Sequence, residues 1–369
     1  MERALANTRD RYDEPHAIRR PLRLMIVDDS TVAQAVLARM IENDPAFEIT
    51  AVAGTAEGAI EALGKVRVDV VILDLEMPGE GGLKLLPRIL AAAAGAKVLV
   101  VSSGAEEGAE NTVKALALGA ADTLSKPGIS RFNGRFSEIL VSKLKALGFA
   151  TGRKLLPTQS QGGGSISLRA MPSDPIGALA IGASTGGIHA LGVLFRALPD
   201  KIGVPILITQ HLPSAFMPVF ARQLAGMSHR ETLVAENGMV LLPDRIILAS
   251  GDAHLTLEKH GQGAVVRLIG GRSASGCMPS VDPMFGTLGA VYGPVALGVI
   301  LTGMGRDGVE GSARLVAAGG SIIAQDEASC AVWGMPRAVT EAGLASAILS
   351  PDKIARRIAA RVEGLVSCK

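Results

Sequence analysis

Aromatic residues, cysteines and an excess of one charge are all scarce in this sequence. Its 369 residues include one Trp, two Tyr and three Cys, and 37 Lys and Arg nearly balance 35 Asp and Glu, for a net charge of +2. So few aromatic side chains favour parallel strands packed by helices over a base-stacking surface or an all-β core. The balanced charge gives no reason to expect nucleic acid as a partner. The length allows two or three domains, each with its own core.

The three cysteines, Cys277, Cys330 and Cys368, lie far apart and show no metal-ligand spacing. An odd number of scattered cysteines fits a reducing compartment. The first 20 residues are charged and lack the apolar segment of a secretion signal. We therefore expect a cytoplasmic protein.

Two uncharged runs, residues 175–195 and 283–305, are long enough to raise the question of a membrane span. The first is interrupted by Ser-Thr-Gly-Gly, and the second contains several glycines and two prolines. Such interruptions are typical of a buried strand followed by a turn. We expect no membrane insertion.

Strand-like and helical patterns alternate five times in the first half of the chain. The apolar runs are 22–27, 47–53, 68–73, 97–101 and 121–124, and the helical patterns are 31–42, 56–63, 83–93, 107–118 and 137–147. Five such βα units predict a doubly wound parallel sheet. In such a sheet, function gathers at the carboxyl ends of the strands.

Polar side chains stand at four of these strand ends: Asp28 with Asp29, then Asp74, Ser102 and Lys126. Each alone could be a helix cap or a turn residue. Three carboxylates at one edge, however, repel each other unless a cation neutralises them, and an all-oxygen site suits magnesium. A lysine and a hydroxyl nearby would complete a site able to hold a phosphoryl group.

This stretch resembles the receiver domain of two-component response regulators. The matching segments are Val27-Asp28-Asp29-Ser30, Leu73-Asp74-Leu75-Glu76-Met77-Pro78, Val101-Ser102-Ser103 and Ser125-Lys126-Pro127. The resemblance implies that Asp74 accepts phosphate from a histidine kinase, and that Asp28, Asp29, Asp74 and the Glu76 carbonyl surround Mg²⁺. It also implies that Ser102 is the switch hydroxyl and Lys126 the lysine that pairs with phosphate. One departure is Gly81-Gly82, where such domains usually have Asp-Gly.

After residue 148 the alternation stops, and 149–175 has the Pro, Gln, Gly and Ser content of a linker. A second α/β pattern begins at 176. Its expected strands are 178–182, 204–210, 245–249, 264–268, 295–301 and 321–324, with 245–268 as a candidate antiparallel excursion, and its expected helices are 188–197, 216–225, 281–291, 308–318 and 351–365. We therefore expect two doubly wound, mostly parallel sheets. A flavodoxin-like receiver (21–148) follows a tail (1–20), and a larger α/β hydrolytic domain (176–369) follows the linker.

The sequence Gly182-Ala183-Ser184-Thr185-Gly186 follows an apolar run and precedes a helical pattern. A strand, sharp turn and helix of this kind expose the serine as a nucleophile. The alternative is a turn that packs tightly or cradles phosphate. A dinucleotide site would need an acidic residue at the end of the next strand. That strand ends in Gln210-His211, which favours proton transfer.

A serine nucleophile needs a base and a group that orients the base. His211 directly follows a strand expected beside that of Ser184, and His254 is the second candidate. The carboxylate candidate is Asp307, in a glycine-rich loop after the strand at 295–301. The alternative for Asp307 is that it only caps the helix beginning at Gly308.

The second half resembles the catalytic domain of the chemotaxis protein-glutamate methylesterases. The matching segments are 181–187, Gln210-His211-Leu212-Pro213, 301–308 and 324–336. The resemblance implies a Ser184, His211 and Asp307 triad, without a cofactor, that hydrolyses glutamate methyl esters on chemoreceptors and deamidates receptor glutamines. It also implies that the unphosphorylated receiver covers this site. Our candidates for the oxyanion donors are the backbone N–H groups of Thr185 and Met304.

Some positions depart from the family pattern. Cys277-Met278 replaces the usual His-Arg, and Ser250 stands where Pro is usual. Both changes bear on substrate recognition, so a non-catalytic response regulator whose second half binds a protein partner stays an alternative. A Cys330 nucleophile is disfavoured because no histidine lies on its stretch or after it. A nucleic-acid output domain would need a basic helix-turn-helix, which the second half lacks.

Overall fold

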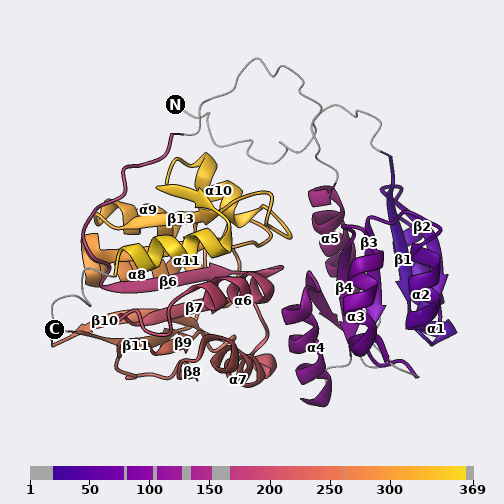
Figure 1. The fold of residues 1–369 in the computed structure, drawn as a ribbon, viewed down its shortest axis with the longest axis horizontal. Helices are drawn as coiled ribbons and strands as arrows, with labels where there is room; N and C mark the ends of the chain where they lie inside the picture. The colour runs from indigo at the N-terminus through magenta and orange to yellow at the C-terminus, as the bar shows by residue number, and fades with distance from the viewer. Residues whose placement is uncertain are drawn as a thin grey trace, which may run out of the picture.

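The computed structural model describes residues 20–78, 81–102, 106–126, 134–151, 167–261 and 263–362. Almost all of the expected tail, residues 152–166 of the expected linker, and Cys368 lie outside these ranges. The described residues form two α/β domains side by side (Figure 1).

The first domain is a five-stranded parallel sheet with the order β2-β1-β3-β4-β5. Its strands are β1 (Leu22–Val27), β2 (Phe47–Ala53), β3 (Val70–Asp74), β4 (Lys97–Ser102) and β5 (Asp122–Ser125). Its helices are α1 (Thr31–Glu42), α2 (Ala56–Leu63), α3 (Gly81–Ala92), α4 (Glu106–Leu118) and α5 (Gly134–Thr151). This order is that of the flavodoxin-like doubly wound fold, as predicted.

The second domain is built on a seven-stranded parallel sheet with the order β14-β13-β12-β6-β7-β9-β8. Its strands are β6 (Ala178–Ala183), β7 (Ile206–Gln210), β8 (Thr232–Val234), β9 (Ile246–Leu248), β12 (Ala296–Ile300), β13 (Ser321–Gln325) and β14 (Ala347–Leu349). Its helices are α6 (Gly187–Ala197), η1 (Ser214–Phe216), α7 (Met217–Ser228), α8 (Val281–Tyr292), η2 (Gly293–Val295), α9 (Val309–Ala317), α10 (Met335–Glu341) and α11 (Pro351–Ala360). The predicted fold class is confirmed.

The central strand β6 lies where the order of the second sheet reverses. The chain runs outward from β6 to β7 on one side and returns through β12 on the other. Loops leaving neighbouring strands in opposite directions open a crevice at the carboxyl edge of the sheet. This topology places the residues after β6, β7 and β12 around one crevice.

The predicted antiparallel excursion at 245–268 was only partly right. β9 joins the parallel sheet, whereas β10 (His254–His260) and β11 (Gly263–Ile269) form a separate antiparallel pair. β8, β10, β14 and α10 were not predicted from the sequence. β8 and β14 have only three residues each, which is too short for a periodic pattern to appear.

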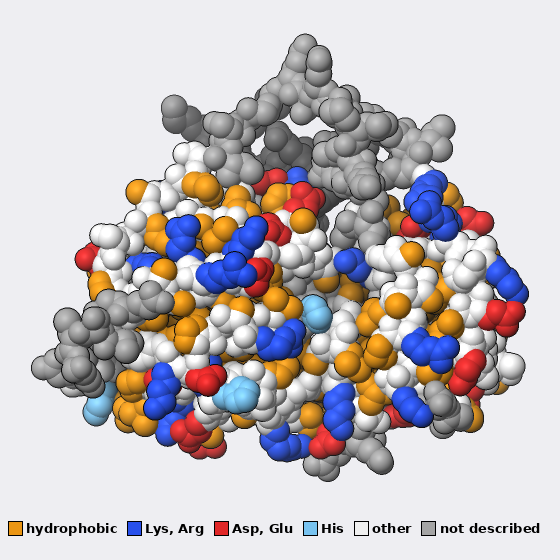
Figure 2. Space-filling model, viewed as in Figure 1, with side chains coloured by type: hydrophobic (Ala, Val, Ile, Leu, Met, Phe, Trp, Pro, Cys, Tyr) orange, Lys and Arg blue, Asp and Glu red, His pale blue; other side chains and the backbone are white. Residues whose placement is uncertain are grey.

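Among the described residues, no helix combines the length and apolar character needed to cross a bilayer. The two long uncharged runs instead form β6, a turn and α6, and α8, η2 and β12. On the face shown in Figure 2, basic and acidic side chains are interspersed over both domains, in keeping with the balanced net charge.

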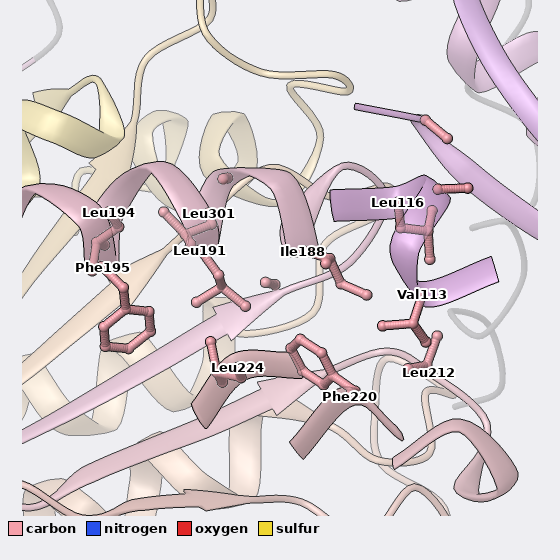
Figure 3. Close-up of a cluster of buried hydrophobic side chains, with 14 of the residues drawn as sticks. Val113, Leu116, Ile188, Leu191, Leu194, Phe195, Leu212, Phe220, Leu224 and Leu301 are labelled. Atoms are coloured by element: carbon pink, nitrogen blue, oxygen red, sulfur yellow. The ribbon is translucent and has the colours of Figure 1, made fainter. Parts of the chain in front are cut away.

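The two domains share a continuous apolar cluster. Val113 and Leu116 of α4 contact the second domain beside Ile188 and Leu212, and Phe220 of α7 lies next to them (Figure 3). All five side chains are buried. Because the burial of these apolar side chains is favourable, α4 holds the receiver against the carboxyl edge of the second sheet.

Candidate functional sites

The first candidate site is the acidic cluster at the ends of β1 and β3. Asp28, Asp29 and Asp74 each offer an oxygen within 4.8 Å of the others, and Asp28 and Asp74 are buried. Lys126 Nζ lies 3.0 Å from Asp28 Oδ2 and 2.6 Å from Asp74 Oδ2. Three carboxylates with only oxygen ligands form a donor set suited to Mg²⁺. The cluster is therefore consistent with a magnesium site.

The charges in this cluster alter each other's protonation. Burial raises the pKa of Asp74, and the neighbouring Asp28 adds to this, although Lys126 opposes it. Burial acts to lower the pKa of Lys126, but the two carboxylates outweigh it and raise that pKa. Lys126 therefore stays charged and ties the two acidic strand ends together.

The two other predicted receiver residues stand at the carboxyl ends of β3 and β4. The Glu76 N–H donates to Asp74 Oδ1 at 3.0 Å, so the backbone after β3 turns around the acidic side chain. Ser102 is buried at the end of β4, and its Oγ lies 2.6 Å from Thr112 Oγ1 of α4. The Ser102 hydroxyl therefore contacts the helix that packs on the second domain.

The second candidate site begins with Ser184, directly after β6. Its N–H donates to the Thr302 carbonyl at 3.0 Å, so it continues the pairing with the segment after β12. Gly186, which precedes α6, has a φ of +77°. Residues with a side chain rarely adopt this backbone conformation. A Cβ on Gly303 would lie 2.7 Å from Ser184 Cβ. The positive φ of Gly186 and the missing side chain of Gly303 thus make the predicted sharp turn possible.

His211 follows β7, the strand beside β6. Ala183 pairs with Gln210 in the sheet register, and the His211 N–H donates to the Ala183 carbonyl at 3.0 Å. Ser184 and His211 therefore follow paired strand ends, and both line a cleft of about 390 Å³. Among the described residues, no hydrogen bond joins the Ser184 hydroxyl to His211. Catalytic hydrogen bonds are often longer without substrate and tighten in the complex.

Asp307 is brought to His211 by the loop between β12 and α9. His211 Nε2 lies 2.7 Å from Asp307 Oδ2. The Asp307 carboxylate is buried and also accepts from Ser275 Oγ at 2.8 Å, Ser280 Oγ at 2.6 Å and the Val281 N–H at 2.7 Å. Gly308 is the N-cap residue of α9, and no side chain caps that helix. The Asp307 side chain therefore contacts the imidazole and does not cap the helix.

The His211 and Asp307 pair has shifted pKa values. Burial acts to lower the pKa of His211, but the hydrogen bonds and charges of Asp307 and Cys277 outweigh it and raise the pKa to about 9. Burial acts to raise the pKa of Asp307, but His211, Ser280 and Val281 outweigh it and lower that pKa. The aspartate is ionised and favours the charged imidazolium.

The other candidates from the sequence are engaged elsewhere. His254 Nε2 lies 3.1 Å from the Gly271 carbonyl, and its Nδ1 accepts from the Ser280 N–H at 3.0 Å. Both of its ring nitrogens therefore serve to hold the loop before α8. Burial raises the pKa of the Cys330 thiol to about 12, which disfavours the thiolate that a cysteine nucleophile needs.

The candidate oxyanion donors flank Ser184. Thr185 is buried, whereas Met304 is partly exposed in the loop after β12. The Thr185 carbonyl accepts from Thr302 Oγ1 at 2.9 Å, which links the two loops. Neither the Thr185 N–H nor the Met304 N–H has an acceptor among the described residues. Both N–H groups are therefore free to donate to a bound oxyanion.

Sequence reasoning missed the groups that hold Asp307. Ser280 precedes α8, and its hydroxyl accepts from the Asp282 N–H at 3.2 Å while donating to Asp307. Its sequence, Ser280-Val281-Asp282-Pro283, carries an N-cap signature that could have located it. The second use of the hydroxyl, as a donor across 27 positions, has no signal in the sequence.

The receiver lies directly over the turn that carries Ser184. The Gly186 N–H donates to the Ala121 carbonyl at 2.6 Å, and Thr185 Oγ1 donates to Asp122 Oδ2 at 2.6 Å. Asp122 and Lys143 of the receiver line the same cleft as Ser184 and His211. The receiver strand β5, which leads to Lys126, is thus hydrogen-bonded to the candidate active site.

A receiver joined to an α/β domain with a serine, a histidine and an aspartate at one sheet edge defines a response regulator with a hydrolase-type output domain. Residues 24–132 match the response regulator receiver domain family, and residues 179–358 match the CheB methylesterase family. The chain is 40% identical over 347 residues to protein-glutamate methylesterase/protein-glutamine glutaminase 2 of Caulobacter vibrioides, covering 93% of this chain and 100% of that protein. The chain therefore belongs to the CheB family of protein-glutamate methylesterases.

One further relative and one solved structure are also similar to this chain. The chain is 36% identical over 368 residues to protein-glutamate methylesterase/protein-glutamine glutaminase 1 of Paramagnetospirillum magneticum, covering 93% of this chain and 97% of that protein. The crystal structure of the Thermotoga maritima CheB methylesterase catalytic domain aligns with 33% identity over 51% of this chain and 98% of that chain, with a TM-score of 0.48.

Proposed function

We propose that this protein hydrolyses glutamate methyl esters on chemoreceptors with a Ser184, His211 and Asp307 triad, under the control of phosphorylation at Asp74. The observation that carries the triad is the 2.7 Å contact between His211 Nε2 and Asp307 Oδ2 beside the Ser184 turn. The proposed division is a tail at 1–20, a receiver at 21–148, a linker at 149–175 and a catalytic domain at 176–369, in the cytoplasm.

The reaction proceeds by acyl transfer. Neutral His211 takes the proton from Ser184 Oγ as this oxygen bonds to the ester carbonyl carbon, and it then protonates the leaving methoxide to give methanol. Asp307 holds the ring and stabilises the imidazolium. A water molecule then attacks the acyl-serine with His211 again as base, which releases the glutamate carboxylate and restores Ser184.

The Thr185 and Met304 N–H groups donate to the oxygen that becomes negative in each tetrahedral intermediate. Each such donor contributes roughly 3 kcal/mol to the stabilisation of the transition state. The same steps with ammonia as the leaving group deamidate a receptor glutamine, the second activity named for the two bacterial relatives.

In the receiver, a histidine kinase serves as the phosphodonor and Asp74 as the acceptor. Asp28, Asp29, Asp74 and the Glu76 carbonyl would hold Mg²⁺, which would supply positive charge to offset the negative charge of the phosphoryl oxygens. Lys126 then pairs with the phosphoryl group, and Ser102 acts as the switch hydroxyl. Because Lys126 now binds both Asp28 and Asp74, phosphorylation changes the partners of the residue that follows β5.

The unphosphorylated receiver blocks the catalytic cleft. Support comes from Asp122 of β5 and from Ala121 just before it, which bond the residues just after Ser184. A shift of β5 on phosphorylation breaks these bonds and opens the cleft. The block thus combines coverage of the cleft with a direct hold on the turn of the nucleophile.

Asp122→Ala is expected to raise the basal rate of methanol release about tenfold, measured without phosphodonor. The Thr185 Oγ1 to Asp122 Oδ2 bond is 2.6 Å long and has a charged acceptor, and such bonds contribute about 1.5–3 kcal/mol. In the closed state the receiver blocks the cleft, and in the open state it does not. Loss of the bond shifts the equilibrium constant toward the open state by about a factor of 10 for each 1.4 kcal/mol.

Asp44→Ala is the matched control for Asp122→Ala. Besides Thr185, Asp122 pairs with Lys143 of α5 at 2.6 Å. Asp44 likewise pairs with Lys145 of α5 at 2.6 Å, but near the β2 edge of the receiver. An equal rise in both variants would contradict a specific hold of Asp122 on the catalytic turn.

Asp74→Asn is expected to remove activation, so that methanol release is the same with and without an acyl phosphate donor. The amide offers no carboxylate oxygen to form the acyl phosphate. The assay compares wild type and variant with methylated receptor membranes, with and without Mg²⁺. Undiminished activation in the variant would place the phosphoryl acceptor elsewhere.

The alternative is a response regulator whose second half only binds a protein partner. The Cys277-Met278 replacement of the family's usual His-Arg favours it, since a positive charge that could face an acidic receptor surface is lost. A fluorophosphonate probe separates the two functions. Labelling at Ser184 in the folded protein supports the hydrolase, whereas an unlabelled folded protein supports the binding function.

A further inference from the structure

The loop before α8 adds a thiol to the His211 and Asp307 pair. A ring nitrogen of His211, Cys277 Sγ and a carboxylate oxygen of Asp307 all lie within 4.8 Å of one another. The three residues come from three separate segments, after β7, before α8 and before α9. The proposed reaction uses His211 and Asp307 but leaves the thiol without a task.

We propose that His211, Cys277 and Asp307 form a binding site for Zn²⁺ or a similar thiophilic divalent cation, and that the bound cation reversibly inhibits the esterase. The inhibition rests on the proposed function, whereas the binding does not. Zinc prefers tetrahedral sites with nitrogen, sulfur and oxygen ligands, and three protein ligands leave a fourth position for water.

The donor set selects the metal. A thiolate and an imidazole favour Zn²⁺ over Mg²⁺, whereas the Asp28, Asp29 and Asp74 cluster offers only oxygens. Among the described residues, the two clusters therefore differ in chemistry, and a cysteine is present in one of them.

The surroundings of the ligands are already ordered. Ser275 Oγ donates to Asp307 Oδ1 at 2.8 Å and accepts from the Cys277 N–H at 3.3 Å, so one serine ties two ligands together. Ser273 Oγ donates to the Cys277 carbonyl at 2.9 Å, and Ser280 Oγ donates to Asp307 Oδ1 at 2.6 Å. Hydrogen bonds that orient metal ligands in this way typically raise affinity by 10- to 100-fold.

The site is accessible, and its occupation is incompatible with catalysis. Cys277 is only partly buried, and His211 borders the 390 Å³ cleft. On binding, the imidazole and the thiol release their protons to solvent, and their lone pairs go to the cation. The His211 nitrogen that faces Asp307 is Nε2. With a cation bound to Nε2, the neutral ring carries its proton on Nδ1 and has no lone pair left to accept the Ser184 proton.

The test uses Co²⁺ as a spectroscopic probe of the full-length protein, together with Zn²⁺ inhibition of methanol release. The variants are Cys277→Ser and, as control, Cys330→Ser, and Cys368 is present in both. Wild type and Cys330→Ser are expected to show the thiolate-to-cobalt charge-transfer band. Cys277→Ser is expected to lose the band and to bind Zn²⁺ at that site at least about tenfold more weakly.

In the activity arm, Zn²⁺ is expected to inhibit wild type and Cys330→Ser, with recovery after a chelator is added. Cys277→Ser is expected to need at least about tenfold more Zn²⁺ for the same inhibition. A charge-transfer band that survives in Cys277→Ser, or equal Zn²⁺ inhibition of all three proteins, overturns the proposal. If none of the proteins released methanol, the proposed function would fail, and the cobalt spectrum would still decide the metal site.

Discussion

Ser184→Ala is expected to abolish methanol release from methylated receptor membranes, with kcat falling by at least about 10⁴-fold. Without the hydroxyl, no acyl-serine forms, and only the binding and oxyanion contributions to catalysis remain. The serine stands at the carboxyl end of the central strand, and the sheet register places it next to His211. Methanol release under saturating substrate measures the effect, and fluorophosphonate labelling of the same sample reports the nucleophile directly.

Ser350→Ala is the matched control for the serine variant. Ser350 directly follows β14 at the same edge of the sheet, and its hydroxyl donates to Asp352 rather than to a triad residue. It is expected to keep near-normal activity. Full activity in Ser184→Ala, or labelling that persists in it, would refute the nucleophile assignment.

Asp307→Asn is expected to lower kcat by about 10⁴-fold, as loss of the charged member of such a triad does. Four donors point at the Asp307 carboxylate: His211 Nε2, Ser275 Oγ, Ser280 Oγ and the Val281 N–H. An amide NH₂ in this place either faces these donors or holds the imidazole in the wrong tautomer. Asp244→Asn, at a partly exposed turn where the carboxylate accepts the Gly203 N–H at 2.9 Å, is the control for the same change away from the triad.

The pH dependence separates orientation of the base from a merely structural role of Asp307. The pKa of His211 is raised to about 9, mainly because Asp307 and Cys277 outweigh burial. Catalysis needs the neutral ring. The basal rate of methanol release, measured without phosphodonor, therefore rises with pH up to about 9. Asp307→Asn removes the negative charge, so the His211 pKa measured by NMR is expected to fall, and the acid limb of the rate profile with it. An unchanged His211 pKa would contradict the contact.

The receiver shows how far local patterns can lead. The bounds predicted for β1, β2, α1 and α2 agree with the structure residue for residue. Ser30 and Thr55 cap α1 and α2 with their side chains, so the start of each helix is stated by the residue that begins it. Because these signals lie within a few positions of each other, the sequence alone is enough to place them.

Elements that depend on distant partners were harder to predict. β8 and β14 are three-residue strands at the two edges of the seven-stranded sheet, and only their pairing with β9 and β13 makes them strands. For Asp307, the sequence left open a role as a helix cap, and the contact with His211 across 96 positions is what separates the two roles.

The sequence by itself determined the two α/β domains, their order and the residues that stand at the strand ends, because alternation, capping and glycine placement act locally. Only the tertiary structure decided which of these residues meet. The reversal of strand order at β6 brings His211 and Asp307 together from opposite sides, packing of α4 holds Asp122 against Thr185, and the loop before α8 places Cys277 beside the triad. These contacts join segments far apart in the chain, and the packing of whole elements, rather than any local pattern, sets their distances.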